Sequence, residues 1–390
     1  MTTLRILVTG GGSAGHISPA LAIIGAIQEL AVGADWRPEF RYIGGLRGLE
    51  KGQVEAAGIP FVGVETGKLR RYFSLENFTD LLRIPTGIAQ SRREVARFHP
   101  HVALSTGGYV AVPPVMAAWG LRVPVVIHEQ TVQIGLANRI TANFATKIGL
   151  SYEGALAELN PAQRAKAFVA GNPVRPIIFD GDKAEAIRWA GFAPQDDALP
   201  TIYITGGSQG ARIINRAIES VLPQLLESCR VVHQCGQQPA GGEQDYDRLQ
   251  ATAAALPEAL RRRYHCVKFI GEEIKHVFAL ADLVVGRSGA GTVNEVCALG
   301  KAALFVPLVP TGGDEQTRNA QAVEKIGGAV IVPQAGLDGP CLLCAIDELL
   351  KQPERLRSMG CAALTLAKPN AARDMAAVVV ELGLGLSPGS

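Results

Sequence analysis

The sequence predicts an α/β protein with two doubly wound domains, each built on a parallel sheet covered by helices. Short apolar strands alternate with helices along the chain, and glycine-rich turns join several strands to the helices that follow them. One strand–turn–helix unit also recurs: it reads RILVTGGGSAGHISPALAI near the start and IYITGGSQGARIINRAI in the second half. The length of 390 residues suits two domains better than one.

The first half begins with the strand LRILVT, and a helix is expected over residues 18–31. The strand FRYIG precedes a short helix in GLEKGQVEAAG, and the strand FVGVE precedes a helical region that ends near Phe98. The strands VALST, VPVVIHE and KIGLS follow. Because apolar strands separated by helices pair in parallel, we expect all of these strands in one sheet.

The second half offers the strands TIYITGG, CRVVHQCG, VKFIGEE, LADLVVGRSG, AALFVPL and GAVIVP. Between the halves, the stretch NPVRPIIFDGDKAEAIRWAGFAPQDDALP is rich in proline and charge, which is typical of a linker. We therefore predict an N-terminal domain over residues 1–170, a linker over 171–199 and a C-terminal domain over 200–365. A final segment, 366–390, carries a helix over 370–382 that could pack back on the first domain.

Bulk properties argue against several classes of protein. A net charge of +2 gives no support to a nucleic-acid partner. The sequence shows no signal-peptide pattern at its start and no apolar run of about 18 residues, so a cytoplasmic protein is expected. All 7 cysteines are expected to be free thiols. Cys341 and Cys344 are interpreted as core residues of a helix, not as a zinc or redox site.

The first glycine-rich turn is the strongest functional signal. Gly10, Gly12 and Gly15 form a G-x-G-x-x-G pattern between a strand and a helix, as in dinucleotide-binding proteins. The second strand has no acidic residue at its tip, which disfavours NAD, although Arg47 leaves NADP open. No Lys-Ser or Lys-Thr pair follows the turn, so it is not an ATP-type P-loop.

Three more turns of this kind occur in STGGYV, TGGSQGA and SGAGTVNE. Each can aim free backbone N–H groups and the positive end of a helix at an anion. Four such turns, two in each half, exceed the need of one dinucleotide. They suit two diphosphate-bearing ligands that meet in a cleft between the domains.

Seven motifs occur in a fixed order: GGGSAGHISPALA, STGGYVAVPP, VIHEQ, GNPVR, GGSQGARIIN, RSGAGTVNEV and DEQTRNA. Together they make the chain similar to the MurG glycosyltransferases of bacterial peptidoglycan synthesis, from about residue 4 to about residue 332. The resemblance implies a GT-B fold, with two Rossmann-like domains facing a central cleft. It also implies an inverting transfer of N-acetylglucosamine (GlcNAc) from UDP-GlcNAc to the muramoyl 4-hydroxyl of lipid I, the undecaprenyl-diphosphate-muramoylpentapeptide, which yields lipid II.

The resemblance also implies the contacts of the donor, UDP-GlcNAc. Ser208 and the Gln209 amide would meet the phosphates, Ile270 the uracil, and Glu295 the ribose. Gln316 and Asn319 would read the GlcNAc hydroxyls. The full donor set is Ser13, Ala14, Gly15, Thr131, Arg175, Ser208, Gln209, Ile270, Ala290, Gly291, Thr292, Val293, Asn294, Glu295, Gln316 and Asn319.

The acceptor diphosphate is expected on a second set of residues: Gly12, Gly15, Thr106, Gly107, Gly108 and Tyr109. One position departs from the family, because Thr131 stands where an Asn that touches the donor sugar is usual. Threonine keeps a hydroxyl but loses the reach and the second donor of the amide, which could alter sugar selectivity or rate.

An inverting transfer through an oxocarbenium-like state needs a base for the acceptor hydroxyl. His16 is the first candidate, because its turn places it beside the predicted cleft and imidazole exchanges protons near neutral pH. His128 and Glu129 are the second candidates, with a role in bracing the loop as the alternative. No DxD-like cluster is present, so we expect no metal and no cofactor. Helix N-termini near Ser208 and Gly291 would stabilise the leaving UDP.

One segment bears on where the protein acts in the cell, and several functions other than the lipid I transferase are open. Residues 68–97 combine apolar side chains with seven basic and three acidic ones, which predicts either an anionic membrane surface as partner or an ordinary amphipathic helix. The family implies a peripheral enzyme at the cytoplasmic face of the plasma membrane, with other cell-wall synthesis proteins as candidate partners. The alternatives are a GT-B transferase with another acceptor (diacylglycerol or a natural product), a UDP-sugar epimerase, an NAD(P) oxidoreductase and a non-catalytic UDP-sugar-binding protein.

Overall fold

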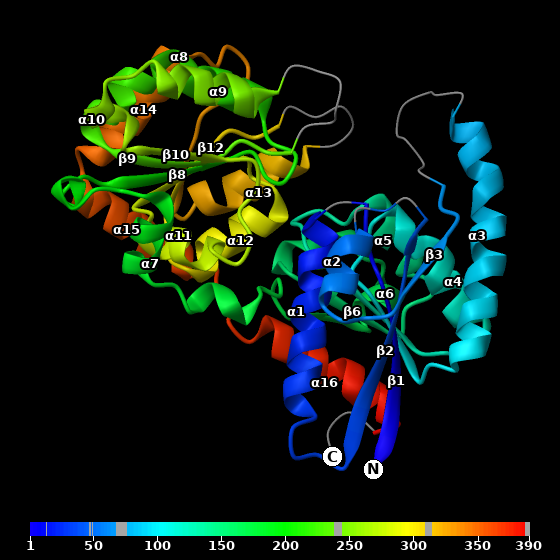
Figure 1. The fold of residues 1–390 in the computed structure, drawn as a ribbon. Helices are drawn as coiled ribbons and strands as arrows, with labels where there is room; N and C mark the ends of the chain where they lie inside the picture. Colours follow the sequence, from blue (N-terminus) through cyan, green and yellow to red (C-terminus); the bar gives the residue numbers. More distant parts are fainter. Residues whose placement is uncertain are drawn as a thin grey trace. The chain divides into compact units, whose positions relative to one another are not determined.

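A computed structural model describes residues 1–12, 14–46, 48, 50–67, 76–237, 244–308 and 314–386, without the side chains of residues 14 and 76–82. The chain forms two compact units (Figure 1). The first comprises Met1–Arg175 together with Lys368–Ser390, and the second comprises Pro176–Ala367.

The first unit contains a seven-stranded parallel sheet in the order β3-β2-β1-β4-β5-β6-β7. Its elements are β1 (Thr2–Thr9), α1 (Ala14–Leu30), β2 (Trp36–Gly45), α2 (Glu50–Ala56), β3 (Phe61–Val64), α3 (Glu76–Phe98), β4 (Val102–Ser105), η1 (Tyr109–Ala111), α4 (Val112–Gly120), β5 (Val125–Glu129), α5 (Leu136–Thr141), β6 (Lys147–Leu150), η2 (Glu153–Glu158), α6 (Pro161–Arg164), β7 (Ala167–Val169) and α16 (Ala371–Leu384).

The second unit contains a six-stranded parallel sheet in the order β10-β9-β8-β11-β12-β13. Its elements are η3 (Pro176–Phe179), α7 (Lys183–Ala190), η4 (Pro194–Asp196), β8 (Thr201–Thr205), α8 (Arg212–Ser228), β9 (Arg230–Gln234), α9 (Asp245–Ala254), α10 (Glu258–Arg261), β10 (Tyr264–Val267), α11 (Ile274–Leu280), β11 (Leu283–Gly286), α12 (Ala290–Ala298), β12 (Ala302–Phe305), α13 (Glu315–Glu324), β13 (Ala329–Ile331), α14 (Gly339–Leu350) and α15 (Pro353–Leu364).

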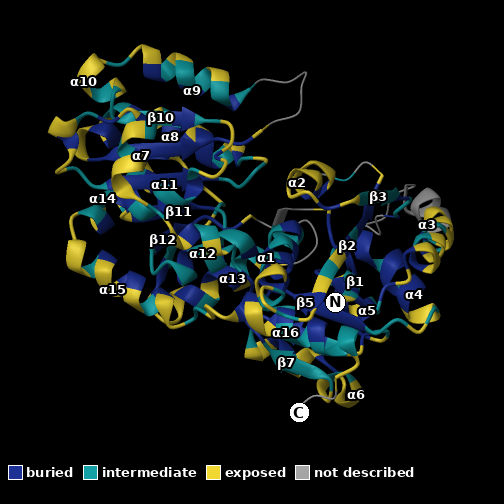
Figure 2. Cartoon of the chain, turned by 60° about the horizontal axis from the view of Figure 1, so that its bottom comes forward, coloured by how far each residue is buried: buried dark blue, intermediate teal, exposed yellow. Residues whose placement is uncertain are grey.

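Side-chain alternation along the strands explains why helices cover both faces of each sheet. In β1, Leu4 and Ile6 enter the core beneath α1 and α16, whereas Leu7 enters the core beneath α3 and α4. The same division separates Ile204 from Tyr203 in β8. Figure 2 shows most strands of both units as buried, with β7 of intermediate exposure, and the outer sides of the helices as exposed. A strand buried on both faces is the pattern of a doubly wound parallel sheet.

The predicted fold class is therefore confirmed: both units are Rossmann-like parallel sheets. In each sheet the strand order reverses direction at the first strand, between β1 and β4 and between β8 and β11. Loops at the carboxyl ends of the strands on either side of such a reversal diverge, which leaves room for a ligand. This places the glycine-rich turns of each unit at the functional edge of its own sheet.

Some boundaries differ from the prediction. The linker was predicted over residues 171–199, but residues 176–199 belong to the second unit, where α7 packs on α11. Helix α16 belongs to the first unit and packs on α1. Strand β7 was not predicted, because only three residues of it pair. Strand β10 ends at Val267, where the predicted strand began.

Two further observations concern cysteines and the membrane. Cys341 and Cys344 are exposed on α14, so their interpretation as core residues was wrong; Leu342 and Ile346 fill the core instead. They lie on the outer side because residues three apart share a helix face. Among the described residues, none of the helices combines the length and the apolar character needed to cross a bilayer.

Candidate functional site

In the first unit, the turn after β1 and the turn after β4 form one hydrogen-bonded structure. The Gly11 amide donates to the Gly107 carbonyl (3.2 Å), and the Thr106 amide donates to the Thr9 carbonyl (3.0 Å). Gly108 has a φ of +81° and packs so closely that a Cβ there would collide with the Gly11 carbonyl oxygen. The predicted acceptor residues Gly12, Gly107, Gly108 and Tyr109 are thus brought together.

Thr106, by contrast, is fully buried, and its hydroxyl and carbonyl both make hydrogen bonds inside the unit. Its hydroxyl donates to the His16 carbonyl (2.7 Å). Its own carbonyl accepts from the side chain of Gln130 (2.5 Å). The prediction that Thr106 contacts the acceptor is corrected, because the residue joins the two turns and presents no surface. Ser13 lies outside the described residues, and Ala14 begins α1.

A buried carboxylate that the sequence analysis missed holds the first turn from beneath. Glu50, at the start of α2, accepts from the Gly45 amide (2.7 Å) and from the Gly12 amide (3.4 Å). Burial, with the Glu50 charge nearby, raises the pKa of Tyr42, whose hydroxyl donates to the Gly10 carbonyl (2.6 Å). The sequence has no acidic residue at the tip of β2, but Glu50 folds back to that tip. Because Glu50 is fully buried, it shapes the turn and offers nothing to a ribose.

His16, the first candidate base, is half-buried on the first turn of α1. Its Nδ1 lies 2.9 Å from the Thr106 carbonyl and 3.0 Å from Gln130 Oε1. In the described part of the chain, every hydrogen bond of its ring involves Nδ1.

His128 is fully buried at the end of β5. Its Nε2 donates to the Gly171 carbonyl (2.8 Å), and its Nδ1 lies 3.3 Å from Gln130 Nε2. Burial lowers the pKa of His128 to about 4, although the bond to Gly171 acts in the opposite direction. The ring therefore stays neutral and has no surface for a substrate, which corrects its candidacy as the base.

Glu129 is also engaged inside the unit. One carboxylate oxygen accepts from the Thr131 amide (3.1 Å), and the other accepts from the Gly135 amide (2.9 Å) and from Asn138 Nδ2 (2.9 Å). Thr131 is buried, and its hydroxyl lies 2.8 Å from Glu129 Oε1 and 2.5 Å from the Gln133 carbonyl. Both residues brace the loop after β5. The structure thus places neither Glu129 as a base nor the Thr131 side chain as a sugar contact.

In the second unit, the turn after β8 carries Ser208 and Gln209. Ser208 is half-buried and Gln209 is exposed. The Ser208 carbonyl accepts from the Gln237 amide (2.8 Å). Gly210 has a φ of +76°, and a Cβ there would strike the Cys235 carbonyl. Gly207 has free space around its α-carbon instead. The turn is therefore packed against main chain on one side and open on the other.

The turn after β11 leads into α12, which begins at Ala290. Gly289 and Gly291 have no atoms near the place a Cβ would take. Thr292, Asn294 and Glu295 are half-buried. Val293 is wholly inside the core, so its predicted contact with the donor is limited to its main chain.

Of the remaining predicted donor residues, Ile270 and Asn319 are buried, and Arg175 and Gln316 are half-buried. Gln316 Oε1 accepts from the Leu308 amide (3.0 Å), and the Gln316 carbonyl accepts from the buried Ser288 hydroxyl (2.8 Å). Asn319 donates to the Ser288 carbonyl (3.2 Å), while its Oδ1 has no partner among the described residues. Ile270 is only 3% exposed, which leaves its side chain little surface for a base. The buried Nε of Arg175 likewise finds no partner in the described ranges.

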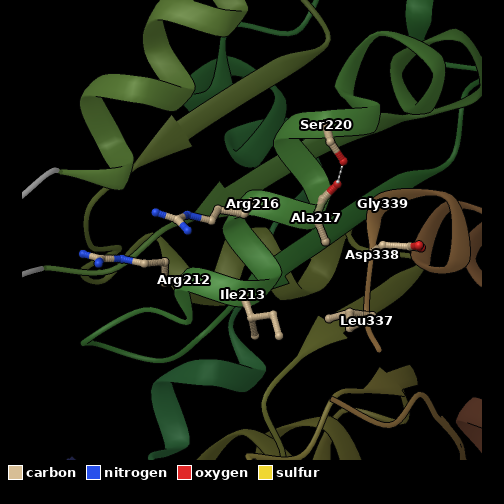
Figure 3. A pocket seen from close by; sticks show the side chains of 8 residues that line it. All are labelled: Arg212, Ile213, Arg216, Ala217, Ser220, Leu337, Asp338 and Gly339. Atoms are coloured by element: carbon tan, nitrogen blue, oxygen red, sulfur yellow. Dashed lines mark hydrogen bonds between the residues drawn. The ribbon is translucent and has the colours of Figure 1, made fainter. Parts of the chain in front are cut away.

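A cavity of about 570 Å³ follows α8 and the loop before α14 (Figure 3). Figure 3 shows Arg212 and Arg216 extending in the same direction, while Ile213 lies near Leu337. None of the predicted site residues lines it.

Comparison with known proteins decides the family. The model of the glycosyltransferase family 28 N-terminal domain matches residues 6–150, and that of the C-terminal domain matches residues 201–376. The chain belongs to glycosyltransferase family 28. Within it, the chain falls among the MurG transferases, as its motifs indicated.

Two curated relatives are named UDP-N-acetylglucosamine--N-acetylmuramyl-(pentapeptide) pyrophosphoryl-undecaprenol N-acetylglucosamine transferase. The one from Treponema pallidum is 37% identical over 96% of this chain and 94% of its own length. The one from Lachnoclostridium phytofermentans is 34% identical over 88% of this chain and 90% of its own length.

Solved structures agree. The crystal structure of Acinetobacter baumannii MurG aligns with a TM-score of 0.70 and 26% identity, covering 97% of this chain and 99% of that one. A putative UDP-N-acetylglucosamine 2-epimerase from Listeria monocytogenes aligns with a TM-score of 0.69 over 98% of this chain and 97% of its own, but at 14% identity. The likeness to the epimerase concerns the fold alone.

Proposed function

We propose that this protein is an inverting hexosyltransferase that moves GlcNAc from UDP-GlcNAc to the muramoyl 4-hydroxyl of lipid I, yielding lipid II. The observation that carries the proposal is the match to transferases of this name over nearly the whole chain, up to 96% of it at 37% identity. The match spans both units, so the proposal does not depend on one nucleotide-binding domain alone.

The second unit is proposed to bind the donor. The turns before α8 and α12 carry open glycines at Gly207, Gly289 and Gly291, where a phosphate could approach the main chain closely. The N-termini of both helices supply partial positive charge that matches the charge developing on the leaving UDP. Removing one such donor from an active site costs roughly 3 kcal/mol of transition-state stabilisation.

The first unit is proposed to bind the acceptor and to take up its proton. His16 Nε2 would accept the proton of the 4-hydroxyl as that oxygen bonds to the sugar C1 and the C1–phosphate oxygen bond breaks. Attack from the face opposite the leaving group inverts the configuration at C1. Gly12, Gly15 and Gly108 are proposed to receive the acceptor diphosphate.

We also propose that main-chain amides, not a metal ion, balance the diphosphate charge. Among the described residues, no three His, Cys, Asp or Glu side chains gather in a way that could hold a metal. Excess EDTA should leave the rate within about twofold. A loss that Mg²⁺ restores would contradict this part of the proposal.

The partner surface is proposed to be the anionic cytoplasmic face of a membrane. Trp119 is 56% exposed beside Phe144 (5.0 Å between ring centroids), and Arg92 and Arg93 are exposed on α3. Arg92 Nη1 lies 3.6 Å from the place a Cβ would take on Gly120, the residue after Trp119. An exposed aromatic group near an arginine suits an anionic lipid surface. Of the predicted segment 68–97, residues 68–75 lie outside the described residues. Vesicles with anionic lipid should pellet the protein in a salt-sensitive manner, and neutral vesicles should not.

The deciding experiment measures label transfer from radioactive UDP-GlcNAc to a short-chain lipid I analogue, with UDP-GalNAc and UDP-glucose as parallel donors. Transfer from UDP-GlcNAc is expected. UDP binding without transfer from any donor would overturn the function. Formation of UDP-ManNAc without an acceptor would instead favour an epimerase.

A further inference from the structure

Gln130, which the proposed function leaves unused, lies between two histidines. It is 1% exposed, and its amide contacts the ring of His16 on one side and the ring of His128 on the other. Three main-chain carbonyls, from Thr106, His128 and Gly171, border the group. Because a carbonyl can only accept hydrogen bonds, these carbonyls fix the direction of the bonds in the group.

The Gly171 carbonyl fixes the ring of His128. It lies 2.8 Å from Nε2, so Nε2 carries the hydrogen. Burial keeps the ring neutral, since it lowers the pKa of His128 to about 4. A neutral imidazole has one hydrogen, and therefore Nδ1 of His128 is an acceptor. The Ser151 hydroxyl, 3.4 Å from Nε2, donates to the Glu129 carbonyl (2.7 Å) and leaves its lone pairs for that hydrogen.

These acceptors then fix the amide of Gln130. Its Nε2 faces the Thr106 carbonyl (2.5 Å), His128 Nδ1 (3.3 Å) and the His128 carbonyl (3.3 Å), all of which accept, so this atom is the NH2 group. The reversed amide would set its oxygen against the Thr106 carbonyl oxygen and a bare ring nitrogen. The Oε1 atom must therefore face His16 Nδ1, at 3.0 Å.

We infer that Gln130 is a positioning residue that, with the Thr106 carbonyl, holds His16 as the Nδ1–H tautomer and leaves the lone pair on Nε2 for the acceptor hydroxyl. Both groups near Nδ1 accept, so that nitrogen carries the hydrogen. The bond made by one ring nitrogen sets the state of the other. The kinetic part of this inference rests on the proposed function, whereas the tautomer does not.

The first test reads the tautomer directly. Uniform ¹⁵N-histidine labelling and long-range ¹H–¹⁵N correlation spectra of the full-length protein report which nitrogen of each ring is protonated, and His16→Asn assigns the His16 signals. Wild-type His16 is expected to be Nδ1–H. A wild-type ring with its hydrogen on Nε2 would overturn the inference without any further variant.

The second test compares Gln130→Leu with Gln130→Glu. The leucine variant removes the acceptor for Nδ1–H, and we expect a growing Nε2–H signal and a kcat about 10- to 100-fold lower, with KM for UDP-GlcNAc within about twofold. The glutamate variant keeps an acceptor for Nδ1–H when the oxygen that replaces Nε2 carries a proton and donates it to the Thr106 carbonyl. In that form Nδ1 should stay protonated, and kcat should exceed that of Gln130→Leu. Gln28→Leu, an exposed change on the same helix as His16, is the matched control.

The outcomes are distinguishable. A wild-type protein without transferase activity whose His16 is Nδ1–H refutes the proposed function and leaves the tautomer assignment standing. A Gln130→Leu protein that keeps its UDP affinity, its tautomer and its kcat refutes the role of Gln130. If Gln130→Leu fails to fold, the wild-type spectrum and Gln130→Glu still decide the inference.

Discussion

The two units build the same turn, after the first strand of each unit, by different means. In the first unit, buried side chains hold the turn. The Glu50 carboxylate accepts from the amides of Gly12 and Gly45, and the Tyr42 hydroxyl donates to the Gly10 carbonyl. In the second unit, main chain packs on main chain, and Gly210 lies against the carbonyl of Cys235.

This difference suggests a division of labour between the units. Side-chain supports can set the protonation of a neighbour, as Gln130 does for His16 in our inference. Main-chain supports carry no titratable group, but they leave Gly207, Gly289 and Gly291 open to a ligand. The same topology can thus prepare the first unit for proton transfer from the acceptor and the second unit for binding the phosphates of the donor.

The largest expected effect is a loss of stability in acid, and it involves both units. Burial lowers the pKa of His128 to about 4 and that of His233 to about 3. The unfolded chain protonates these rings near pH 6.5, so it binds more protons than the folded chain below that pH. Stability should fall as the pH drops from 6.5 to 4, by roughly 3 kcal/mol for His128 and somewhat more for His233.

Urea unfolding between pH 7 and pH 4, followed by tryptophan fluorescence, measures this loss. His233→Gln should flatten the dependence on pH. A wild-type protein equally stable at both ends would contradict the burial of neutral rings.

The next largest effect tests the role of the first unit in proton transfer. His16→Asn should lower kcat by about 1,000-fold, since loss of a general base typically costs two to four orders of magnitude. UDP affinity, measured by calorimetry, should stay within about twofold. His99→Asn, an exposed change in the same unit, is the control. A kcat within tenfold of wild type would exclude His16 as the base.

A pair of glycine variants tests the phosphate-binding side. Gly210→Ala should destabilise the protein by about 3 kcal/mol and weaken UDP binding, because the new Cβ strikes the Cys235 carbonyl at a φ of +76°. Gly291→Ala meets open space, so its stability in urea should stay within about 1 kcal/mol of wild type. Equal stability of the two variants would show that main-chain packing does not hold this turn.

The smallest effect concerns the side-chain support of the first turn. Glu50→Gln keeps the shape but loses the charge that the Gly45 amide meets at 2.7 Å, which should cost about 2 kcal/mol of stability. KM for the acceptor should rise more than KM for UDP-GlcNAc. Glu55→Gln, at an exposed position just before the end of α2, is the control. A parallel rise of both constants would show that Glu50 acts on the whole protein.

Local patterns carried most of the fold prediction. Strand–helix alternation predicted both sheets, and the glycine motifs predicted which turns meet at the functional edges. The short β7 gave no signal, because three half-buried residues lack a clear period. Local patterns also could not predict the hydrogen bonds that hold the site, because their partners are far apart in sequence. Glu50 and Gly12 lie 38 residues apart, and His16 and Gln130 lie 114 apart.

The resemblance to the family located the site but not the use of each side chain. Val293 belongs to a matching motif and Thr131 directly follows one, yet Val293 fills the core and Thr131 ties a loop together. Such roles depend on which way a side chain points once the loops have met. Motif matching cannot supply that direction, whereas burial and hydrogen bonds can.

Helix α16 gives the first unit a particular order of assembly. Met375 and Val379 lie in the same core as the residues of β1 and α1, although the whole second unit separates them in sequence. A ribosome must therefore finish the second unit before it releases the last piece of the first. The contiguous second unit can fold while synthesis continues. The first unit cannot complete its hydrophobic core until α16 has been synthesised. Truncation at the C-terminus would thus damage the unit that is made first.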